Sequence, residues 1–503
     1  MTATENSNKR TDGSAFSSSP SSDSNKKLSR ADGSKGAQQK SLDSFFKTSG
    51  GDKKGKAAPK AASADTIAAD TVAAVTKRKG SLLEWREFEL TWIGTYKSPE
   101  PATKFAAFDL DSTLINVKGS WKYPKDANDW RFFHKEVPSV LRRMYDQGYK
   151  IVIMSNQNGL RQTKGAKELT KRAVEYLEKI DQIARQLDFP FTILTALDKN
   201  YMRKPAPGMW FMAEMDNCDL EVDRESSFYV GDAAGRPAGW RPGAVEDFSD
   251  SDLAFALNAG VSFYTPEEVF NAEIIAKEEP LPLPAPREWP ISRFHPASIV
   301  KDQDSLNDLI AELENEVVLA QKANIGILVI LVGPPASGKS TFSGTHLRPL
   351  GFEQVTMDVL KTRKKCDAAV KDALTAGRFV VVDNTSPDET ARGSFVKIAA
   401  DAGARTIAVV FDREKTRDLA NHNNVYRSLL HQARYLTRPY NEKKLHLIPS
   451  KFNPVPPVAF HTFFKKLTMP SESEGFSRIF RHVFVPVFLK PPSDEALWNQ
   501  YYY

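Results

Sequence analysis

The sequence predicts an α/β protein with two domains and an N-terminal tail that does not fold alone. Apolar runs typical of buried strands alternate with helical stretches over residues 81–276 and again over 301–503, which is the pattern of parallel sheets. A proline-rich segment, 277–300, separates the two series as an extended linker. Residues 1–80 are rich in Ser, Lys, Ala and Gly. Their apolar side chains are too few to offset the entropy of folding, so we expect disorder there.

The elements follow in order along the chain. "LLEWREFELTWIGTY", 82–96, alternates apolar and polar residues and predicts strands. The first domain then continues with four apolar runs, "KFAAFDLD", "YKIVIMS", "PFTILTA" and "SSFYVGD", and the second with "IGILVILVG", "RFVVVDNT" and "TIAVVFD". Each run is followed by a stretch of helical character, so each domain is expected to hold a parallel sheet.

Composition excludes several classes of protein. The chain has 503 residues and a formal net charge of +6, which permits an anionic partner without requiring one. Its two cysteines exclude a disulfide framework and a cysteine-based zinc site, and they suit a reducing compartment. No apolar run reaches the roughly 18 residues of a membrane span, so no membrane partner is expected.

One segment of the tail differs from its surroundings. Gln39, Leu42, Phe45 and Phe46 follow the spacing Q-x-x-L-x-x-F-F within residues 39–46. One helical turn would place the three apolar side chains on one face, where a partner groove is their natural destination. The spacing resembles the peptide by which replication and repair proteins hold the sliding clamp; the alternative is a chance match. The basic clusters of the tail serve either solubility or nuclear import and nucleic-acid contact.

The first chemical motif ends a predicted strand. Asp109 and Asp111 stand in "FDLDSTL", and ligands collect at the carboxyl ends of parallel strands. D-x-D-x-T at that place resembles the haloacid-dehalogenase phosphatase superfamily. The resemblance implies that Asp109 attacks phosphorus and becomes an aspartyl-phosphate. It implies that Asp111 protonates the leaving oxygen and then activates water, and that Thr113 holds the turn.

Three further residues match the same superfamily in order. Ser155 ends the strand "KIVIMSNQ", Lys204 stands in "YMRKPAPGMW", and Asp232 in "FYVGDAAGR". The resemblance implies that Ser155 binds a phosphoryl oxygen and that Lys204 neutralises the phosphoryl group. Asp232 would complete an oxygen-only Mg²⁺ site with Asp109 and a backbone carbonyl near Asp111. The alternative is that these residues are only structural.

The second motif is a phosphate-binding loop after an apolar strand. "GPPASGKS" matches G-x-x-x-x-G-K-[ST] and should open a helix. Backbone N–H groups would cradle the phosphates of ATP, Lys339 would reach the β- and γ-phosphates, and Ser340 would bind Mg²⁺. The residues expected to bind ATP are Gly333, Pro334, Pro335, Ala336, Ser337, Gly338, Lys339, Ser340 and Thr341.

Three later segments of the second domain are candidates for the acceptor site and a lid. Asp358 follows the next strand and is the candidate general base for a hydroxyl; the alternative is a helix N-cap. Asp383 and Asn384 end another strand and contact the metal or substrate, or only cap the turn. Arg427 in "NHNNVYRSL" begins a lid over the phosphates, or is a surface arginine.

With both motifs in view, the chain resembles the polynucleotide kinase 3′-phosphatases of DNA end repair from residue 85 to the end. The matching text is "FDLDSTLI", "DWRFF", "GYKIVIMSNQ", "RKPAPGMW", "FYVGDAAGRP", "DFSDSDLAFALNAG", "TPEEVF", "GPPASGKST", "VDNTSPD", "HNN" and "EGFSRI". The resemblance implies a haloacid-dehalogenase-like 3′-phosphatase over 81–276 and a P-loop 5′-hydroxyl kinase over 301–503. It implies a nuclear, monomeric enzyme that prepares strand breaks for DNA ligase and works beside other break-repair factors.

A strand end is a polyanion with unpaired bases, so basic and aromatic residues are expected near each site. Arg203 and Arg236 flank phosphatase motifs, and Trp130 and Trp210 are candidates to stack on bases. The alternative for each tryptophan is a place in the core.

The sequence departs from the family at two places. Many relatives carry an N-terminal forkhead-associated domain, which nothing in this sequence resembles, so clamp recruitment is expected instead of phosphopeptide recruitment. Met357 stands where animal relatives often have arginine, which removes one charge near the 5′ end.

Three other functions compete with DNA end healing. They are a fused small-metabolite kinase and phosphatase, an RNA end-healing enzyme, and a clamp- or nucleic-acid-binding scaffold with decayed sites.

Overall fold

The computed structural model describes residues 80–502 except 122, 161–167, 272–282, 284, 286–288, 300, 412–414, 437–453, 489 and 491. The predicted tail with its peptide 39–46 lies outside the described residues, as does much of the predicted linker 277–300. Within the described residues no helix has the length and apolar character needed to cross a membrane.

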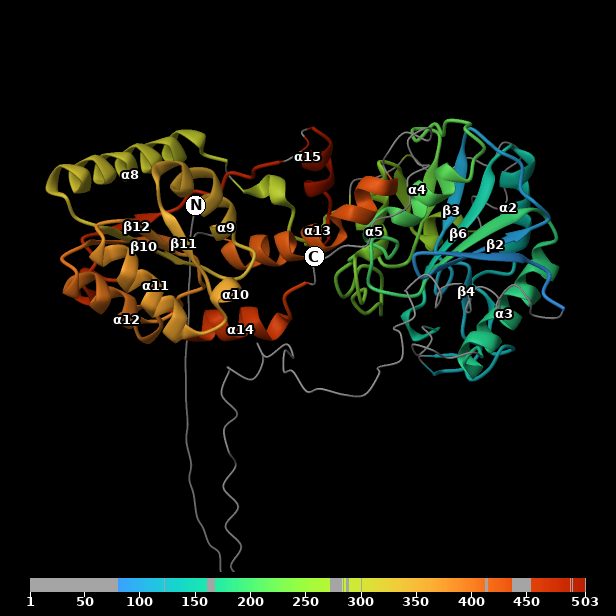
Figure 1. The fold of residues 1–503 in the computed structure, drawn as a ribbon. Helices are drawn as coiled ribbons and strands as arrows, with labels where there is room; N and C mark the ends of the chain where they lie inside the picture. The colour runs from blue at the N-terminus through green and yellow to red at the C-terminus, as the bar shows by residue number, and fades with distance from the viewer. Residues whose placement is uncertain are drawn as a thin grey trace, which may run out of the picture. The chain divides into compact units, whose positions relative to one another are not determined.

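The first half of the described chain, which is predicted to be the phosphatase, is built on a seven-stranded sheet (Figure 1). Its order is β1-β2-β7-β6-β3-β8-β9; β1 and β2 are antiparallel additions, and the other five strands are parallel. The strands, with the small β4–β5 pair, are β1 (Glu84–Phe88), β2 (Thr91–Tyr96), β3 (Phe105–Phe108), β4 (Ile115–Asn116), β5 (Arg131–Phe132), β6 (Lys150–Asn156), β7 (Phe191–Ala196), β8 (Phe228–Val230) and β9 (Ser262–Tyr264). The predicted parallel sheet and the predicted strands within 82–96 are confirmed.

Helices cover both faces of this sheet. They are α2 (Val137–Asp146), α3 (Lys171–Leu187), α4 (Gly208–Met215), α5 (Ser251–Ala259) and α6 (Pro266–Val269). Alternate residues of β6 enter different cores: Ile151 and Ile153 pack with α2 and α3, while Val152 and Met154 pack with α4 and α5. A strand buried on both faces explains the continuous apolar run in the sequence.

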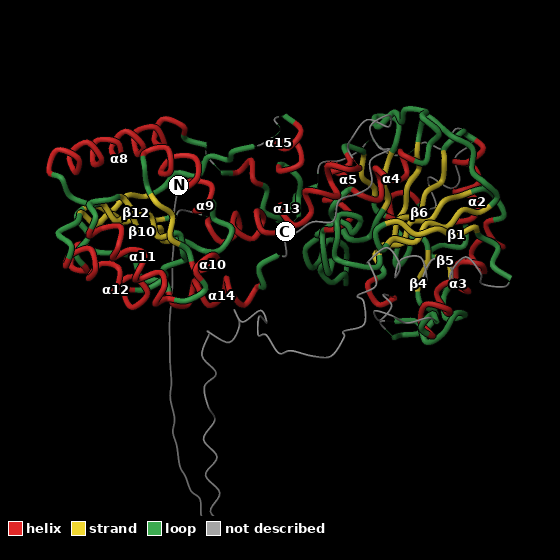
Figure 2. Tube along the Cα trace, in the orientation of Figure 1, coloured by secondary structure: helices red, strands yellow, loops and turns green. Residues whose placement is uncertain are grey.

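The second half of the described chain, which is predicted to be the kinase, has its own five-stranded parallel sheet (Figure 2). Its order is β11-β12-β10-β13-β14, and every neighbouring pair is parallel. The strands are β10 (Ile327–Val332), β11 (Glu353–Val355), β12 (Phe379–Val382), β13 (Arg405–Val410) and β14 (Arg478–Arg481). β10 lies in the middle and is buried along its whole length, so the loop that follows it is held by a rigid support.

Helices enclose the second sheet from both sides. In Figure 1, α8 lies on one side of β10 and β12, while α11 and α12 lie on the other. Leu328 and Ile330 of β10 face α11 and α12, and Val329 and Leu331 face α8. The described helices are α8 (Gln303–Ala323), α9 (Lys339–Phe342), α10 (Met357–Leu360), α11 (Arg363–Thr375), α12 (Glu389–Asp401), α13 (Thr416–Leu436), α14 (Pro457–Lys466) and α15 (Ser493–Trp498).

Candidate active sites

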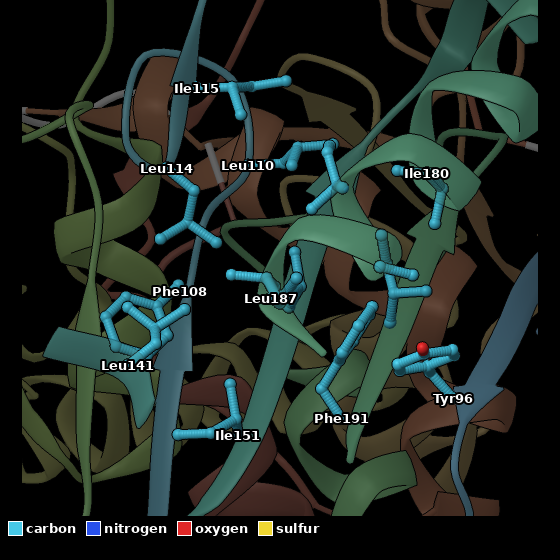
Figure 3. Packing of buried hydrophobic residues seen from close by; sticks show 14 of the residues in the cluster. Tyr96, Phe108, Leu110, Leu114, Ile115, Leu141, Ile151, Ile180, Leu187 and Phe191 are labelled. Atoms are coloured by element: carbon cyan, nitrogen blue, oxygen red, sulfur yellow. The ribbon is translucent and has the colours of Figure 1, made fainter. Parts of the chain in front are cut away.

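The strand ends of the first sheet bring the predicted phosphatase residues together. Asp109 follows β3, Ser155 lies near the end of β6, and Asp232 follows β8. Leu110 is fully buried in the core that Figure 3 shows, near Leu114. Because this leucine anchors the loop, the aspartates on either side of it are turned away from the hydrophobic core.

A buried lysine is the centre of the predicted phosphatase site. The Lys204 ammonium lies 2.5 Å from Asp109 Oδ1 and 2.7 Å from Asp252 Oδ1, and it donates to the Tyr229 hydroxyl at 2.7 Å. Burial acts to lower the pKa of Lys204, but the attraction of the two carboxylates exceeds that effect and the pKa is raised. A permanent positive charge therefore stands beside the proposed nucleophile.

Three carboxylates gather at the same point. Asp109, Asp232 and Asp252 each offer an oxygen, and these oxygens lie within 4.8 Å of one another. Burial, reinforced by the neighbouring carboxylates and opposed by Lys204, raises the pKa of Asp109 to about 7 and that of Asp232 to about 8. A dense oxygen-only cluster with excess negative charge fits Mg²⁺, which favours such ligands. Thr113 Oγ1 is 3.4 Å from Asp232 Oδ1 and supports the cluster.

Asp252 was not predicted from the sequence. It lies in the first turn of α5, where its Oδ2 accepts from the backbone N–H of Ala233 at 3.1 Å. A Cβ on Gly231 would come within 2.5 Å of the Asp252 side chain, so only glycine permits this approach. The available signal was the acidic run in "DFSDSDL" at the start of a helix, but the sequence does not show which of its aspartates points inward.

Asp111 differs from the other acids because its side chain is half exposed. Its Oδ2 accepts from Gln157 Nε2 at 2.5 Å, and its Oδ1 lies 3.3 Å from Lys179 Nζ. Gln157 Nε2 also lies 3.0 Å from the buried Ser155 hydroxyl. The predicted proton-transfer residue thus stands at the solvent side of the site, next to the predicted phosphoryl-binding hydroxyl.

The phosphate-binding loop connects β10 to α9, as predicted. Ala336 and Gly338 have φ values of 60° and 97°, which turn the loop before α9 begins at Lys339. A Cβ on Gly333 would lie 2.6 Å from the Phe411 Cβ, so the first glycine is required by close packing. Lys339 Nζ lies 3.0 Å from Gly333 O and 2.6 Å from Pro334 O. Burial lowers the pKa of Lys339 to about 8.

A cavity of about 250 Å³ adjoins this loop. Lys339, Ser340, Thr341 and Arg427, which are predicted to bind ATP, are among the residues that line it. Burial lowers the pKa of Arg427 to about 10. Sequence reasoning missed the aromatic part of the lining, which includes His346, His482, Phe484, Phe488 and Trp498. Such a lining suits the flat base of a nucleotide.

The acceptor-side residues lie at the ends of β11 and β12. Thr356 is the N-cap of α10, and its hydroxyl accepts from the backbone N–H of Asp358. Asp358 therefore does not cap the helix, and it is exposed. Asp383 is buried and accepts from Gln354 Nε2 at 2.8 Å, while Asn384 Oδ1 accepts from the Met357 N–H at 3.0 Å. Both Asp358 and Asp383 act to raise the pKa of Lys339, so both lie within electrostatic range of the loop.

The structure corrects the predicted stacking residues. Trp130 and Trp210 are both buried. Their indole N–H groups donate to Gln182 and Glu214, respectively. Both tryptophans are therefore core residues, and their buried rings are not available to stack on a base.

Two arginines near the phosphatase motifs also differ in their surroundings. Arg236 is buried and bonded to Asp247 at 2.7 Å and Glu267 at 3.0 Å. Its charge is therefore used within the protein, which corrects the expected nucleic-acid contact. Arg203 is half-buried, and burial lowers its pKa.

Other aromatic side chains are strongly exposed instead. Trp121 and Tyr123, in the loop between β4 and β5, are 64% and 62% exposed, and Phe248, shortly before α5, is 91% exposed. The first loop follows Asp111 closely in the chain, and the second connects Asp232 to Asp252. Sequence reasoning missed them because the neighbouring residues in the sequence do not show whether an aromatic side chain is buried or exposed.

Known proteins resemble the chain in both halves. Residues 104–270 match the family described as polynucleotide kinase 3 phosphatase, and residues 328–429 match the AAA domain family. The bifunctional polynucleotide phosphatase/kinase of Schizosaccharomyces pombe is 31% identical over 420 residues, which cover 84% of this chain and 88% of that protein. A putative bifunctional polynucleotide phosphatase/kinase of Acanthamoeba polyphaga mimivirus is 28% identical over 79% of this chain and 88% of its own length.

A third relative matches the phosphatase half. The polynucleotide 3′-phosphatase ZDP of Arabidopsis thaliana is 30% identical over 217 residues, which cover 41% of this chain and 29% of that protein. The Schizosaccharomyces pombe protein is matched over most of both chains, and each half of this chain has its own family match. The chain belongs to the family of bifunctional polynucleotide phosphatase/kinases.

Proposed function

We propose that this protein heals the ends of broken DNA strands: it removes 3′-phosphates and phosphorylates 5′-hydroxyls with ATP. The observation that carries the proposal is the presence of two separate sites in one chain. One holds a buried lysine between two carboxylates, and the other is a phosphate-binding loop beside a cavity lined in part by aromatic side chains. The names of the relatives, bifunctional polynucleotide phosphatase/kinase, support the same pairing.

In the proposed phosphatase reaction Asp109 is the nucleophile. One of its oxygens bonds to phosphorus while the bond from phosphorus to the 3′-oxygen breaks, and Asp111 gives its proton to that oxygen. Asp111 then takes a proton from water, the water oxygen bonds to phosphorus, and inorganic phosphate leaves Asp109. Lys204 neutralises charge on the phosphoryl oxygens, and Ser155 donates a hydrogen bond to one of them.

Asp109, Asp232 and Asp252 would hold Mg²⁺ at this site, with the backbone carbonyl at Asp111 as a further ligand. The ion would supply charge neutralisation where the phosphoryl group binds.

In the proposed kinase reaction Asp358 is the general base. It accepts the proton of the 5′-hydroxyl as that oxygen bonds to the γ-phosphorus of ATP and ADP leaves. Lys339 and Arg427 neutralise the phosphates, and Ser340 would hold Mg²⁺. Asp383, which is buried and accepts a hydrogen bond from Gln354, would support the same ion or contact the substrate.

The exposed aromatic residues support a nucleic-acid substrate over a small metabolite. Trp121, Tyr123 and Phe248 lie on the two loops connected to the phosphatase aspartates. An exposed ring near a strand end can stack on an unpaired base, at about 1–3 kcal/mol per base. We further propose action at strand breaks in the nucleus, with recruitment by a sliding clamp through residues 39–46 and transfer of the healed ends to DNA ligase.

The test uses one nicked DNA duplex with a 3′-phosphate and a 5′-hydroxyl at the break. Parent, Asp109→Asn and Lys339→Met proteins are each supplied with ATP, Mg²⁺ and a DNA ligase. We expect the parent to permit sealing, the first variant to leave the 3′-phosphate, and the second to leave the 5′-hydroxyl. A nicked RNA strand in parallel separates DNA from RNA preference. Unprocessed ends in both polymers, with hydrolysis of small phosphate esters, would overturn the proposal.

A further inference from the structure

The Asp111 carboxyl group is held from two sides by residues of different elements. Its Oδ1 faces Lys179 Nζ of α3 at 3.3 Å, and its Oδ2 faces Gln157 Nε2, just after β6, at 2.5 Å. With one donor on each oxygen, rotation of the carboxyl group about its Cβ–Cγ bond is restrained. The orientation of this half-exposed side chain is therefore set by the protein.

Lys179 is placed in a way that is unusual for lysine. Its side chain is 7% exposed, whereas that of Asp111 is 50% exposed. It lies on the buried face of α3, and its neighbour Ile180 belongs to the hydrophobic core shown in Figure 3. A buried ammonium destabilises a protein unless it is paired, so the pair with Asp111 makes this placement possible. Because Lys179 is buried and Asp111 is half exposed, a substrate reaches the carboxyl group and not the ammonium.

Gln157 connects Asp111 to a second part of the site. The same Nε2 that donates to Asp111 lies 3.0 Å from the Ser155 hydroxyl. The backbone N–H of Gln157 donates to Ala196 O of β7 at 2.8 Å, which fixes the residue at the edge of the sheet. The side-chain amide of Gln157 therefore fixes the Asp111 carboxyl group and the Ser155 hydroxyl relative to each other.

We infer that Lys179 is a positioning residue for proton transfer by Asp111, with Gln157 as the second support. This inference rests on the aspartyl-phosphate reaction proposed above. Asp111 must present one oxygen first to the leaving 3′-oxygen and then to the attacking water. Orientation of a reacting group is worth a large part of a rate enhancement, so release of the carboxyl group should slow both proton transfers. Formation of the bond to Asp109 should keep its rate only where the leaving group departs without a proton.

The test compares two leaving groups with Lys179→Met protein. p-Nitrophenolate leaves without a proton, so p-nitrophenyl phosphate requires Asp111 only in the second step. We expect a rapid burst of about one p-nitrophenol per enzyme, followed by turnover about 100-fold slower than that of the parent. A 3′-phosphorylated oligonucleotide requires Asp111 in both steps, so it should show slow turnover and no burst of product strand.

Three further variants make the result specific. Lys171→Met alters a lysine of the same helix whose side chain is 88% exposed, and it should behave as the parent. Lys179→Arg keeps a charged donor and should restore a large part of the turnover, while Gln157→Leu should produce a smaller burst of the same kind. Kinase activity of each protein on a 5′-hydroxyl oligonucleotide reports that the kinase half is folded, and denaturant unfolding reports the same for the phosphatase half.

Slow turnover of p-nitrophenyl phosphate without a burst, or a change in KM alone, would overturn the inference and make Lys179 a structural or substrate-contacting residue. If Lys179→Met does not fold, the arginine and Gln157→Leu variants decide by the same burst criterion. If the parent protein hydrolyses p-nitrophenyl phosphate but not DNA 3′-phosphates, the proposed substrate is refuted. The burst with p-nitrophenyl phosphate still decides the role of Lys179 in that case.

Discussion

Replacement of Asp252 by asparagine separates the metal role of the acidic cluster from its role in folding. At 2.7 Å, the Lys204–Asp252 attraction is about 6 kcal/mol with an effective dielectric constant near 20. Asp252 is also repelled by Asp109 and Asp232, whose oxygens lie within 4.8 Å. Each repulsion is at least about 3.5 kcal/mol by the same formula when the carboxylates are ionised, which requires a pH above 8 because their pKa values are about 7 and 8. The two together then cancel the attraction. Above pH 8 and in EDTA, we therefore expect the free energy of unfolding to change by no more than about 1 kcal/mol.

The effect on the metal should be much larger. A carboxylate removed from the surroundings of a bound ion typically costs 10–100-fold in affinity. We therefore expect Asp252→Asn to need about 10–100-fold more Mg²⁺ for half-maximal phosphatase activity, while kinase activity at saturating Mg²⁺ stays at the parent level. Glu246→Gln, an exposed charge change in the preceding loop, is the matched control.

Two assays decide the outcome. Phosphatase rates are measured across a Mg²⁺ titration, and denaturant unfolding is followed in EDTA. An unchanged Mg²⁺ midpoint would refute the assignment of Asp252 to the metal cluster. Destabilisation by more than about 3 kcal/mol in EDTA would show that attraction to Lys204, and not repulsion among the acids, dominates this site.

Three other perturbations test separate parts of the chain. Arg392 is fully buried and donates two hydrogen bonds to Glu474, of 2.7 and 2.8 Å. Arg392→Met leaves this buried carboxylate unpaired, so we expect the free energy of unfolding of the kinase half, measured with denaturant, to fall by about 3–5 kcal/mol. Burial lowers the pKa of His422 to about 4, below the 6.5 of an unfolded chain, so up to about 3 kcal/mol of stability should be lost as the pH falls from 6.5 to 4. Unfolding of His422→Phe across that pH range should lack this contribution. Phe45→Ala with Phe46→Ala should abolish binding to a sliding clamp in a pull-down and leave both activities unchanged.

Each of these three predictions has an outcome that contradicts it. Equal stability of Arg392→Met and parent would mean that Glu474 finds another partner. The same pH slope for parent and His422→Phe protein would assign acid sensitivity to other groups. Equal clamp binding by parent and double variant would reduce the spacing in residues 39–46 to coincidence.

The parts of the sites that could be predicted are those encoded by local sequence. The phosphate-binding loop needs glycines and a lysine at fixed spacing, because its backbone must curl round a phosphate. The aspartates at 109 and 111 come directly after a buried strand, so their place at the sheet edge follows from the strand itself. Both motifs were found because nearby residues in the chain form them.

The parts that could not be predicted depend on packing between distant elements. Lys179 occurs in an ordinary amphipathic helix, and only the docking of α3 brings it to Asp111. Trp130 and Trp210 lie near catalytic motifs in the sequence, yet their rings fill the core. Arg236 is next to a motif, but Asp247 and Glu267 neutralise it. In each case tertiary structure determines which residue the side chain contacts, and the neighbouring residues in the sequence do not.

The construction of each site on its own sheet has a genetic consequence. All described residues of the phosphatase cluster come from positions 109–252, and those of the nucleotide site from 306–498. Two chains damaged in different halves, one at Asp109 and the other at Lys339, should therefore complement each other in the same cell. Because one polypeptide carries both halves, each act of synthesis delivers the two activities in equal numbers, and no separate control of gene dosage is needed to keep them balanced.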